Sequence, residues 1–249
     1  VAVLDGEGRA LLGARADEPF PAASVIKLPL VMALYADAAE GRLSLEERAP
    51  VAPAVDGSGI LRSLRDVGPV SLRDLATLAI VLSDNTATNR LIERIGITRV
   101  CERLDEWGCR LSRLRRKMYD FDAQRCGLEN VMTPRETAAL LLRLLRGECA
   151  DRATSDAVLA LLELNQDDSM LRRHLPPGVR LAHKTGTLEG VRNDAGIVTV
   201  ERPVVVAAFL RELVDVAQGH ALLGLLGWCA HRAAGAAAAP LPSERWVEA

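Results

Sequence analysis

The chain has 249 residues, of which 49% are hydrophobic and 26% charged, an ordinary globular composition that excludes a largely disordered chain. Its net charge of −2 lacks the basic excess of proteins that bind nucleic acid, so we expect no nucleic acid partner. Its longest apolar runs, such as residues 221–230, fall short of the roughly 18 to 20 residues that cross a bilayer, so we expect no membrane span.

The cysteines and histidines form no recognisable metal-binding pattern. The cysteines are odd in number and include no CxxC pair, and the histidines include no HExxH spacing. The cysteines stand at positions 101, 109, 126, 149 and 229. The stretch Gly57-Ser58-Gly59 lacks the later glycine of a dinucleotide-binding loop. We therefore expect mostly free cysteines, no metal and no cofactor.

The N-terminal part predicts a hairpin followed by a buried helix. Two short runs, residues 1–5 and 9–12, flank a glycine-rich turn, as in a pair of antiparallel strands. From Ser24 to Ala39 apolar residues recur at helical intervals, and Pro29 is tolerated there because it lies in the first turns. Residues 43–69 are rich in proline and glycine and predict loops.

The middle of the chain is predicted to be helical. One helix starts after Ser71, a capping residue with Asp74 three positions later, and runs to about Leu82. Thr133 followed by Pro134 marks another helix start. Helical periodicity covers residues 85–95, 98–107, 133–146 and 155–164.

After Leu181 the pattern changes from helix to strand. Three β-rich runs, at residues 181–185, 195–201 and 204–210, are separated by turn residues and followed by a helix over 213–232. Strands at both ends of the chain predict one sheet domain, from residues 1–16 and 178–249, around an inserted all-helical domain, residues 17–177. We expect the active site in the cleft between the two domains.

Three short motifs carry the chemistry: Ser24-Val25-Ile26-Lys27, Ser83-Asp84-Asn85 and Lys184-Thr185-Gly186. An SxxK pattern is expected roughly once by chance in a chain of this length, whereas SDN and KTG are each expected on the order of a few hundredths of a time. The joint occurrence of all three, in this order, argues against coincidence.

Ser24 and Lys27 have the spacing of a nucleophile and its base. A serine hydroxyl attacks a carbonyl well only when a neighbouring base takes its proton, and Lys27 projects from the same helix face one turn later. Amides at the helix N-terminus can stabilise the developing oxyanion. Burial and the cations Lys184 and Arg192 would favour a neutral Lys27 by lowering its pKa. The structural alternative is a serine cap with a solvated lysine.

Ser83 and Asn85 lie two residues apart at a predicted turn between helices. They place a hydroxyl and an amide together, and these groups can relay a proton and hold a substrate or Lys27. Asp84 between them is expected to point away. The alternative is a plain capping turn for the helix that follows.

The third motif follows the start of an apolar strand. Lys184 with the hydroxyls of Thr185 and Thr187 suits the binding of a carboxylate, and the Thr187 amide can be a second oxyanion donor. Gly186 allows another backbone to approach closely. Arg192 beyond the strand is a further candidate for binding a substrate carboxylate. The alternatives are an exposed edge strand and ordinary surface charge.

With these motifs the chain resembles class A β-lactamases and penicillin-binding proteins, which carry SxxK, SDN and KTG in the same order. The resemblance extends to residues 57–61 before the SDN helix and to Met132-Thr133-Pro134 at a later helix start, and so covers nearly the whole chain. It implies the α+β fold of β-lactamases and transpeptidases, with an antiparallel sheet flanked by helices and an inserted all-helical domain.

The resemblance also implies roles for the motif residues. Ser24 is implied to be the acylated serine and Lys27 its base. The remaining implied residues are the SDN pair Ser83 and Asn85 and the substrate-binding strand residues Lys184, Thr185, Gly186 and Thr187.

One motif of the class A enzymes is missing. They carry an ExxLN motif in the omega loop, and its glutamate activates the water that hydrolyses the acyl-enzyme. The matching stretch here, residues 113–122, places the glutamate position near Lys117 or Met118. Asp120, Asp122 and Glu129 are the nearby carboxylates that can substitute as the base.

These patterns predict a serine hydrolase that works through an acyl-enzyme, with hydrolysis of the β-lactam amide as the leading activity. The first alternative, favoured by the missing ExxLN motif, is a penicillin-binding D-alanyl peptidase or esterase that deacylates β-lactams slowly. The second is a sensor domain that stays acylated.

The expected partner is a small molecule, a β-lactam or a D-alanyl peptide or ester, and we expect a monomer. The resemblance implies export to the periplasm or the extracellular space. Because the chain begins at Val1 and not at a methionine, we expect an upstream segment such as a signal peptide.

Overall fold

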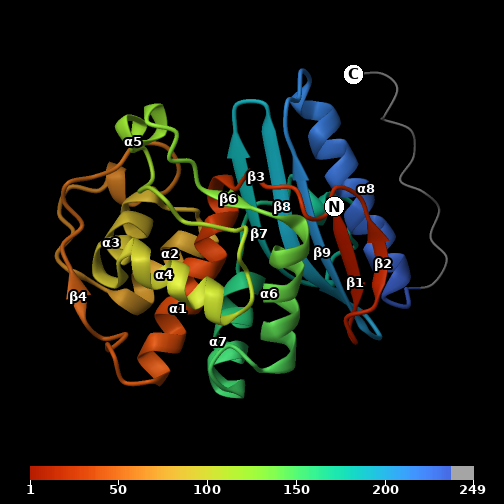
Figure 1. The fold of residues 1–249 in the computed structure, drawn as a ribbon, viewed down its shortest axis with the longest axis horizontal. Helices are drawn as coiled ribbons and strands as arrows, with labels where there is room; N and C mark the ends of the chain where they lie inside the picture. The colour runs from red at the N-terminus through yellow and green to blue at the C-terminus, as the bar shows by residue number, and fades with distance from the viewer. Residues whose placement is uncertain (237–249) are drawn as a thin grey trace.

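The computed structural model describes residues 1–236 and is built on one five-stranded sheet with helices on both faces (Figure 1). The strand order is β2-β1-β9-β8-β7, and all neighbours are antiparallel. These strands are β1 (Ala2–Asp5), β2 (Ala10–Gly13), β7 (Arg180–Leu188), β8 (Val191–Thr199) and β9 (Pro203–Leu210). The N-terminal hairpin therefore joins the C-terminal strands, which confirms the expected α+β fold.

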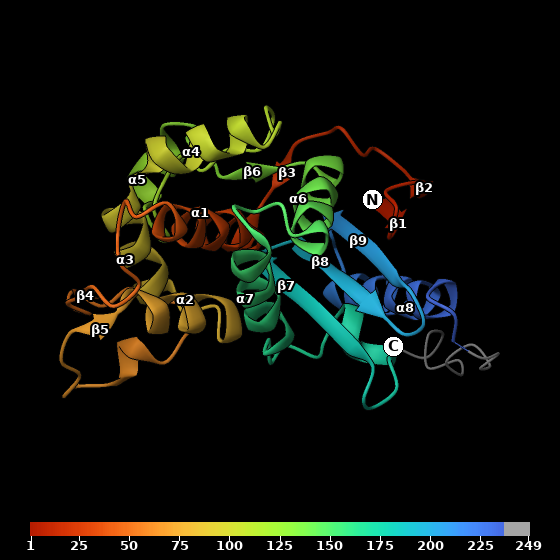
Figure 2. The same cartoon turned by 90° about the horizontal axis from the view of Figure 1, so that it is seen from below.

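Alternate residues of the central strand β9 enter two different cores. Val205, Ala207 and Phe209 pack with the helical part of the molecule. Val204 and Val206 pack on the other face, with residues of the C-terminal helix α8 (Val216–Ala233). On the first face lie α6 (Pro134–Arg146) and α7 (Arg152–Glu163) (Figure 2). Because both faces are covered, β9 is apolar along almost its whole length and does not alternate.

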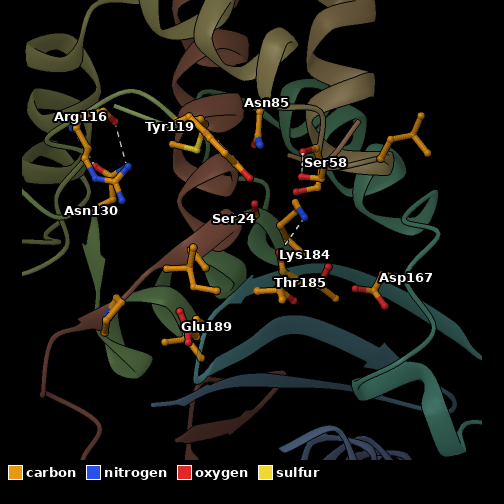
Figure 3. Close-up of a pocket in the computed structure, with 18 of the residues that line it drawn as sticks. Ser24, Ser58, Asn85, Arg116, Tyr119, Asn130, Asp167, Lys184, Thr185 and Glu189 are labelled. Carbon is orange, nitrogen blue, oxygen red and sulfur yellow. Dashed lines mark hydrogen bonds between the residues drawn. The ribbon is translucent and has the colours of Figure 1, made fainter. Parts of the chain in front are cut away.

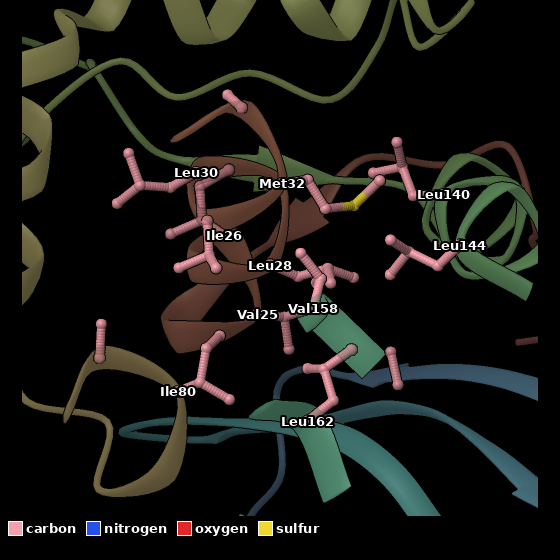
Figure 4. Close-up of a cluster of buried hydrophobic side chains, with 14 of the residues drawn as sticks. Val25, Ile26, Leu28, Leu30, Met32, Ile80, Leu140, Leu144, Val158 and Leu162 are labelled. Atoms are coloured by element: carbon pink, nitrogen blue, oxygen red, sulfur yellow. The ribbon is translucent and has the colours of Figure 1, made fainter. Parts of the chain in front are cut away.

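The helix α1 (Lys27–Ala39) is the centre of the helical part. It is surrounded by α7 and by α2 (Leu72–Val81), α3 (Asn85–Ile95) and α4 (Ile97–Glu106). Every residue from Lys27 to Asp37 is buried, and Figure 4 shows the apolar side chains that pack around this helix. The short 3-10 helix η1 (Ala23–Ile26), which carries Ser24, leads directly into α1. The start of α1 is therefore held firmly in a packed core.

Several short elements were not predicted from the sequence. Two-residue strands pair β3 (Phe20–Pro21) with β6 (Val131–Met132), and β4 (Arg48–Ala49) with β5 (Val70–Ser71). The others are α5 (Phe121–Arg125) and the 3-10 helices η2 (Leu61–Ser63) and η3 (Leu171–His174). Elements this short have no periodicity that a sequence pattern can reveal.

The predicted helices are present, with some displaced ends. Ser71 and Thr133 accept hydrogen bonds from backbone amides of the helices that follow them, as the capping patterns indicate. α7 begins at Arg152, earlier than predicted, because Asp151 caps it. β7 and β8 are longer than their apolar runs because their pairing continues through polar residues, such as Thr185 opposite Asp194.

The domain boundaries at residues 16/17 and 177/178 stay a prediction, and residues 237–249 of the expected sheet domain lie outside the described residues. Within residues 1–236 no helix is both long enough and apolar enough to cross a membrane. The five cysteines are free, as expected.

Replacing Leu28 by alanine tests the importance of the α1 core. The Leu28 side chain is fully buried, so Leu28→Ala should lower the free energy of unfolding by about 3 kcal/mol, measured by urea denaturation. As a control, Leu12 on the edge strand β2 is exposed, and Leu12→Ala should change this free energy by less than about 0.5 kcal/mol. Equal losses from the two substitutions would contradict this description of the core.

Candidate active site

The three motifs meet in one pocket between the helical part and the strand β7 (Figure 3). Its volume is about 860 Å³. Six of the residues singled out in the motifs line it: Ser24, Ser83, Asn85, Lys184, Thr185 and Thr187. Lys27 is buried beside it, and Gly186 lies in β7 between two lining residues. Residues as far apart in the sequence as Ser24 and Thr187, 163 positions, are thus brought together.

Ser24 is held from two sides of the pocket. On the sheet side, Asn193 of β8 donates hydrogen bonds to the carbonyl oxygens of Pro21 (2.8 Å) and Ala22 (3.2 Å). On the helical side, the Ala22 amide donates to the carbonyl oxygen of Asn130 (2.8 Å). A Cβ on Gly186 would lie only 3.1 Å from the Ser24 nitrogen, so the glycine lets β7 pack directly against this turn.

Lys27 lies under the pocket with no exposed surface. Its Nζ donates to the carbonyl oxygen of Ser83 (2.7 Å), to the Ser83 hydroxyl (3.0 Å) and to Oδ1 of Asn85 (2.8 Å). Burial and the nearby Lys184 ammonium lower the pKa of Lys27 well below its ordinary value, and Asp84 acts in the opposite direction. The site therefore holds the amine in place and favours the neutral form that a base requires.

The SDN turn is fixed by Asp84, which points away from the pocket. Its carboxylate accepts hydrogen bonds from the backbone amides of Ala87, Ile60 and Leu61, and so caps α3 and ties it to η2. Ser83 adopts a left-handed backbone conformation, with φ of 54°. Such a conformation is costly for a non-glycine residue, and here it directs both oxygens of Ser83 toward Lys27.

Lys184 is the second buried cation of the site. Its Nζ donates to the Thr185 carbonyl oxygen (2.8 Å). Burial lowers its pKa to about 8, while Asp194 and Asp167 act in the opposite direction. The ammonium thus still predominates at neutral pH and places a positive charge at the pocket.

Arg192 is not brought to the pocket. Its guanidinium donates to the carbonyl oxygens of Leu188 (2.9 Å) and Val191 (2.8 Å) and to Nε2 of His220 (2.9 Å), on the side of the sheet covered by α8. It therefore braces the end of the β7–β8 hairpin.

Residues 113–131 form a closed loop that we call the omega segment. Arg113 and Val131 pair at its neck. The buried Asn130 side chain accepts hydrogen bonds from the amides of Arg115 and Arg116 and donates to the Arg116 carbonyl. The loop is therefore held by internal bonds, which keep its position over the pocket defined.

The helix α3 positions the middle of the omega segment. The Asn89 side chain accepts from the Met118 amide (2.8 Å) and donates to the Met118 carbonyl (3.0 Å), and Glu93 pairs with Lys117 at 2.6 Å. Asn85, Asn89 and Glu93 are spaced by four residues and therefore share one face of α3. One helix face thus contacts both Lys27 and the omega segment.

The three carboxylates proposed as replacement bases lie in different places. Asp120 caps α5 through the Ala123 amide, and Asp122 is exposed and paired with Arg125. Glu129 lines the pocket, where it forms an ion pair with Arg116 at 2.7 Å and accepts further hydrogen bonds from Gln124 and the Asn130 amide. Met118 and Tyr119, also of the omega segment, line the same pocket.

Among the pocket residues that were not identified as site residues from the sequence, Ser58, Tyr119 and Asp167 stand out. Ser58 donates to the Ser83 carbonyl, and the glycines on either side of it were the available signal. Tyr119 has φ of 61° and packs edge-on against Phe121, and Asp167 lies opposite on the β7 side (Figure 3). These two lie in loops without a motif. Within residues 1–236 no cluster of metal-ligating side chains occurs.

Comparison with known proteins agrees with this geometry. A model of the beta-lactamase enzyme family matches residues 1–232. Beta-lactamase L2 of Stenotrophomonas maltophilia is 29% identical over 246 residues, which cover 94% of this chain and 80% of L2. A beta-lactamase structure from Sphaerobacter thermophilus has a TM-score of 0.86 at 34% identity, covering 96% of this chain and 92% of that one.

A second kind of relative has the same fold. The structure of PBP-A has a TM-score of 0.84 at 28% identity, covering 93% of this chain and 88% of that one. A leucine-to-glutamate variant of PBP-A has been solved as an acyl-enzyme complex with penicillin G. From the family match over most of its length, and the similarity to these structures, the chain belongs to the beta-lactamase enzyme family and is a serine hydrolase.

Proposed function

We propose that this enzyme opens β-lactam amides through an acyl-enzyme on Ser24. Lys27 takes the proton from Ser24 Oγ as this oxygen attacks the carbonyl carbon. Ser83, whose hydroxyl lies 3.0 Å from Lys27 Nζ, gives its proton to the leaving nitrogen as the C–N bond breaks and receives in return the proton that Lys27 took from Ser24. Asn85 keeps the lysine in position. Water then cleaves the ester and regenerates the serine.

The observation that carries this proposal is the environment of Lys27. A fully buried lysine with three acceptors around its amine, and with a pKa well below the ordinary value, is suited to act as a base at neutral pH. The names of the relatives support the substrate class, since L2 is a beta-lactamase and has been solved with relebactam. Lys184, Thr185 and Thr187 line the pocket, and we assign to them the binding of the polar group on the leaving side of the scissile bond.

A second candidate function is favoured by the presence of Met118 in the lining of the pocket. The class A resemblance puts a glutamate near Lys117 or Met118. Of these two, Met118 lines the pocket, where it presents a thioether, and Glu129 is paired with Arg116. Deacylation without a base is slow. This supports a D-alanyl peptidase or esterase for which β-lactams are slow substrates, and PBP-A is a relative with a matching fold.

Mass spectrometry of the intact protein during a chromogenic cephalosporin assay tests the nucleophile. The wild-type protein should gain one adduct, whereas Ser24→Ala should show none and should hydrolyse the cephalosporin at least about 1,000-fold more slowly. Ser63, an exposed serine, supplies the control Ser63→Ala, which should behave as wild type. An adduct on Ser24→Ala would refute the mechanism. Sustained turnover favours the first function, and one stoichiometric burst with a stable adduct favours the second.

Placing a glutamate at position 118 tests the cause of slow deacylation. Met118→Glu should speed the loss of a preformed β-lactam adduct at least about tenfold, because it adds a general base beside the acyl ester. Met118→Gln has the same size without the base and should leave the rate near wild type. If both variants speed the loss of the adduct equally, the Met118 side chain slows deacylation by its shape and not by the lack of a base.

The pKa of Lys184 predicts an alkaline limb in the pH profile. With that pKa lowered to about 8, raising the pH above 8 removes the ammonium charge, so kcat/KM for a carboxylate-bearing cephalosporin should fall progressively. On the acid side, acylation should slow as Lys27 becomes protonated. Lys184→Arg stays cationic and should move the alkaline limb to higher pH. An unchanged alkaline limb in this variant would contradict the assignment.

A further inference from the structure

Asp167 occupies the corner of the pocket where the strand β7 presents Lys184 and Thr185 (Figure 3). It belongs to the loop between α7 and η3, outside every motif of the sequence. A cation with neighbouring hydroxyls would by itself attract a carboxylate on the leaving side of the substrate. The carboxylate of Asp167 in the same corner opposes that attraction.

The position of Asp167 is built into the fold. Its Oδ1 accepts from the amide (3.0 Å) and the hydroxyl (2.6 Å) of Ser169, and its own amide donates to Oδ1 of Asn165 (2.9 Å). Asn165 in turn donates to the His183 carbonyl of β7 (3.1 Å). The loop is thus tied to the strand that carries Lys184, and Asp167 is held beside it.

Asp167 stays ionised in this position. Burial raises its pKa, but hydrogen bonds from Ser169 and Thr185 and the Lys184 charge outweigh burial and hold the pKa below its usual value. The corner therefore combines one ammonium with one carboxylate at neutral pH.

No other cation in the described lining of the pocket offsets the negative charge of Asp167. Arg192 does not line the pocket and is bound to backbone carbonyls and to His220, and Arg116 is paired with Glu129. Glu189, at the turn after β7, adds a further carboxylate to the lining. Within the described residues, the lining thus holds three carboxylates against two cations.

We propose that Asp167 makes this enzyme prefer acyl donors that are uncharged on the leaving side of the scissile bond over donors with a carboxylate there. The proposal rests on the acyl-enzyme function proposed above. It keeps the acylation of Ser24 and ranks donors with a leaving-side carboxylate, carboxylate-bearing cephalosporins among them, below uncharged donors. An uncharged polar group on the leaving side of an ester, thioester or amide can accept hydrogen bonds from Lys184 and Thr185. It meets no charge repulsion from Asp167. A carboxylate gains the attraction of Lys184 but meets a fixed like charge.

Two thioesters of hippuric acid that differ in one group test the preference. One has a thioglycolate leaving group, which ends in a carboxylate, and the other has thioglycolamide, which ends in an amide. The measured quantity is kcat/KM for the carboxylate probe divided by kcat/KM for the amide probe, from the loss of thioester absorbance. Because every variant meets the same two leaving groups, their intrinsic reactivities cancel when variants are compared.

Asp167→Asn should raise this ratio about tenfold, because it removes the charge and keeps an oxygen that can accept from Ser169. Asp168→Asn is the matched control: Asp168 is exposed and lines a separate pocket, so this variant should keep the wild-type ratio. A ratio in Asp167→Asn within twofold of wild type overturns the proposal, and so does an equal rise in Asp168→Asn.

A loss of stability does not imitate the expected result, because it lowers both rates together and leaves their ratio unchanged. Asp167→Ser, a smaller neutral side chain, provides a second variant and should raise the ratio in the same direction. If neither probe acylates Ser24 in the wild-type protein by mass spectrometry, the acyl-enzyme function itself fails. If instead the wild-type protein forms the adduct and Asp167→Asn leaves the ratio of kcat/KM values unchanged, only the proposed role of Asp167 fails.

Discussion

The burial of Lys27 is the constraint on which the rest of the site depends. A lysine amine without water around it is costly unless acceptors surround it. Here the carbonyl and hydroxyl of Ser83 and the amide oxygen of Asn85 supply those acceptors. This requirement explains why the SDN turn lies against the start of α1, and why Ser83 adopts a left-handed backbone conformation.

The same constraint links the pocket to the omega segment through α3. Asn85 at the start of α3 binds Lys27, and Asn89 one turn later binds both backbone groups of Met118. A second connection runs from Asn130, through the Ala22 amide, to the turn that carries Ser24. The nucleophile, its base and the wall above them are therefore parts of one hydrogen-bonded unit.

The chemistry of the pocket follows from what this unit presents to a substrate. A serine near a buried lysine with a lowered pKa suits acylation, whereas Met118 offers nothing that activates water, and Glu129 is bound by Arg116. On the opposite side, Asp167 offsets the charge of Lys184. The proposed slow release of the acyl-enzyme follows from this arrangement of Met118 and Glu129, and the proposed preference among acyl donors follows from the charge of Asp167.

The sequence by itself determined the fold class and the residues of the three motifs. The signals behind the fold class are local: helical periodicity, caps such as Ser71 and Thr133, and the apolar runs of the C-terminal strands. They can be recognised without knowing which segments pack against one another. The motifs are equally local, since Ser24 and Lys27 are one turn apart, and the family resemblance followed from them.

Tertiary structure alone decided what depends on segments far apart in the chain. It turned Arg192 away from the pocket, paired Glu129 with Arg116, and placed Asp167 beside Lys184. Each of these outcomes rests on contacts between side chains or backbone groups that sequence spacing does not encode. The charge of a site is the sum of groups from many segments, so it is known only once the chain has folded.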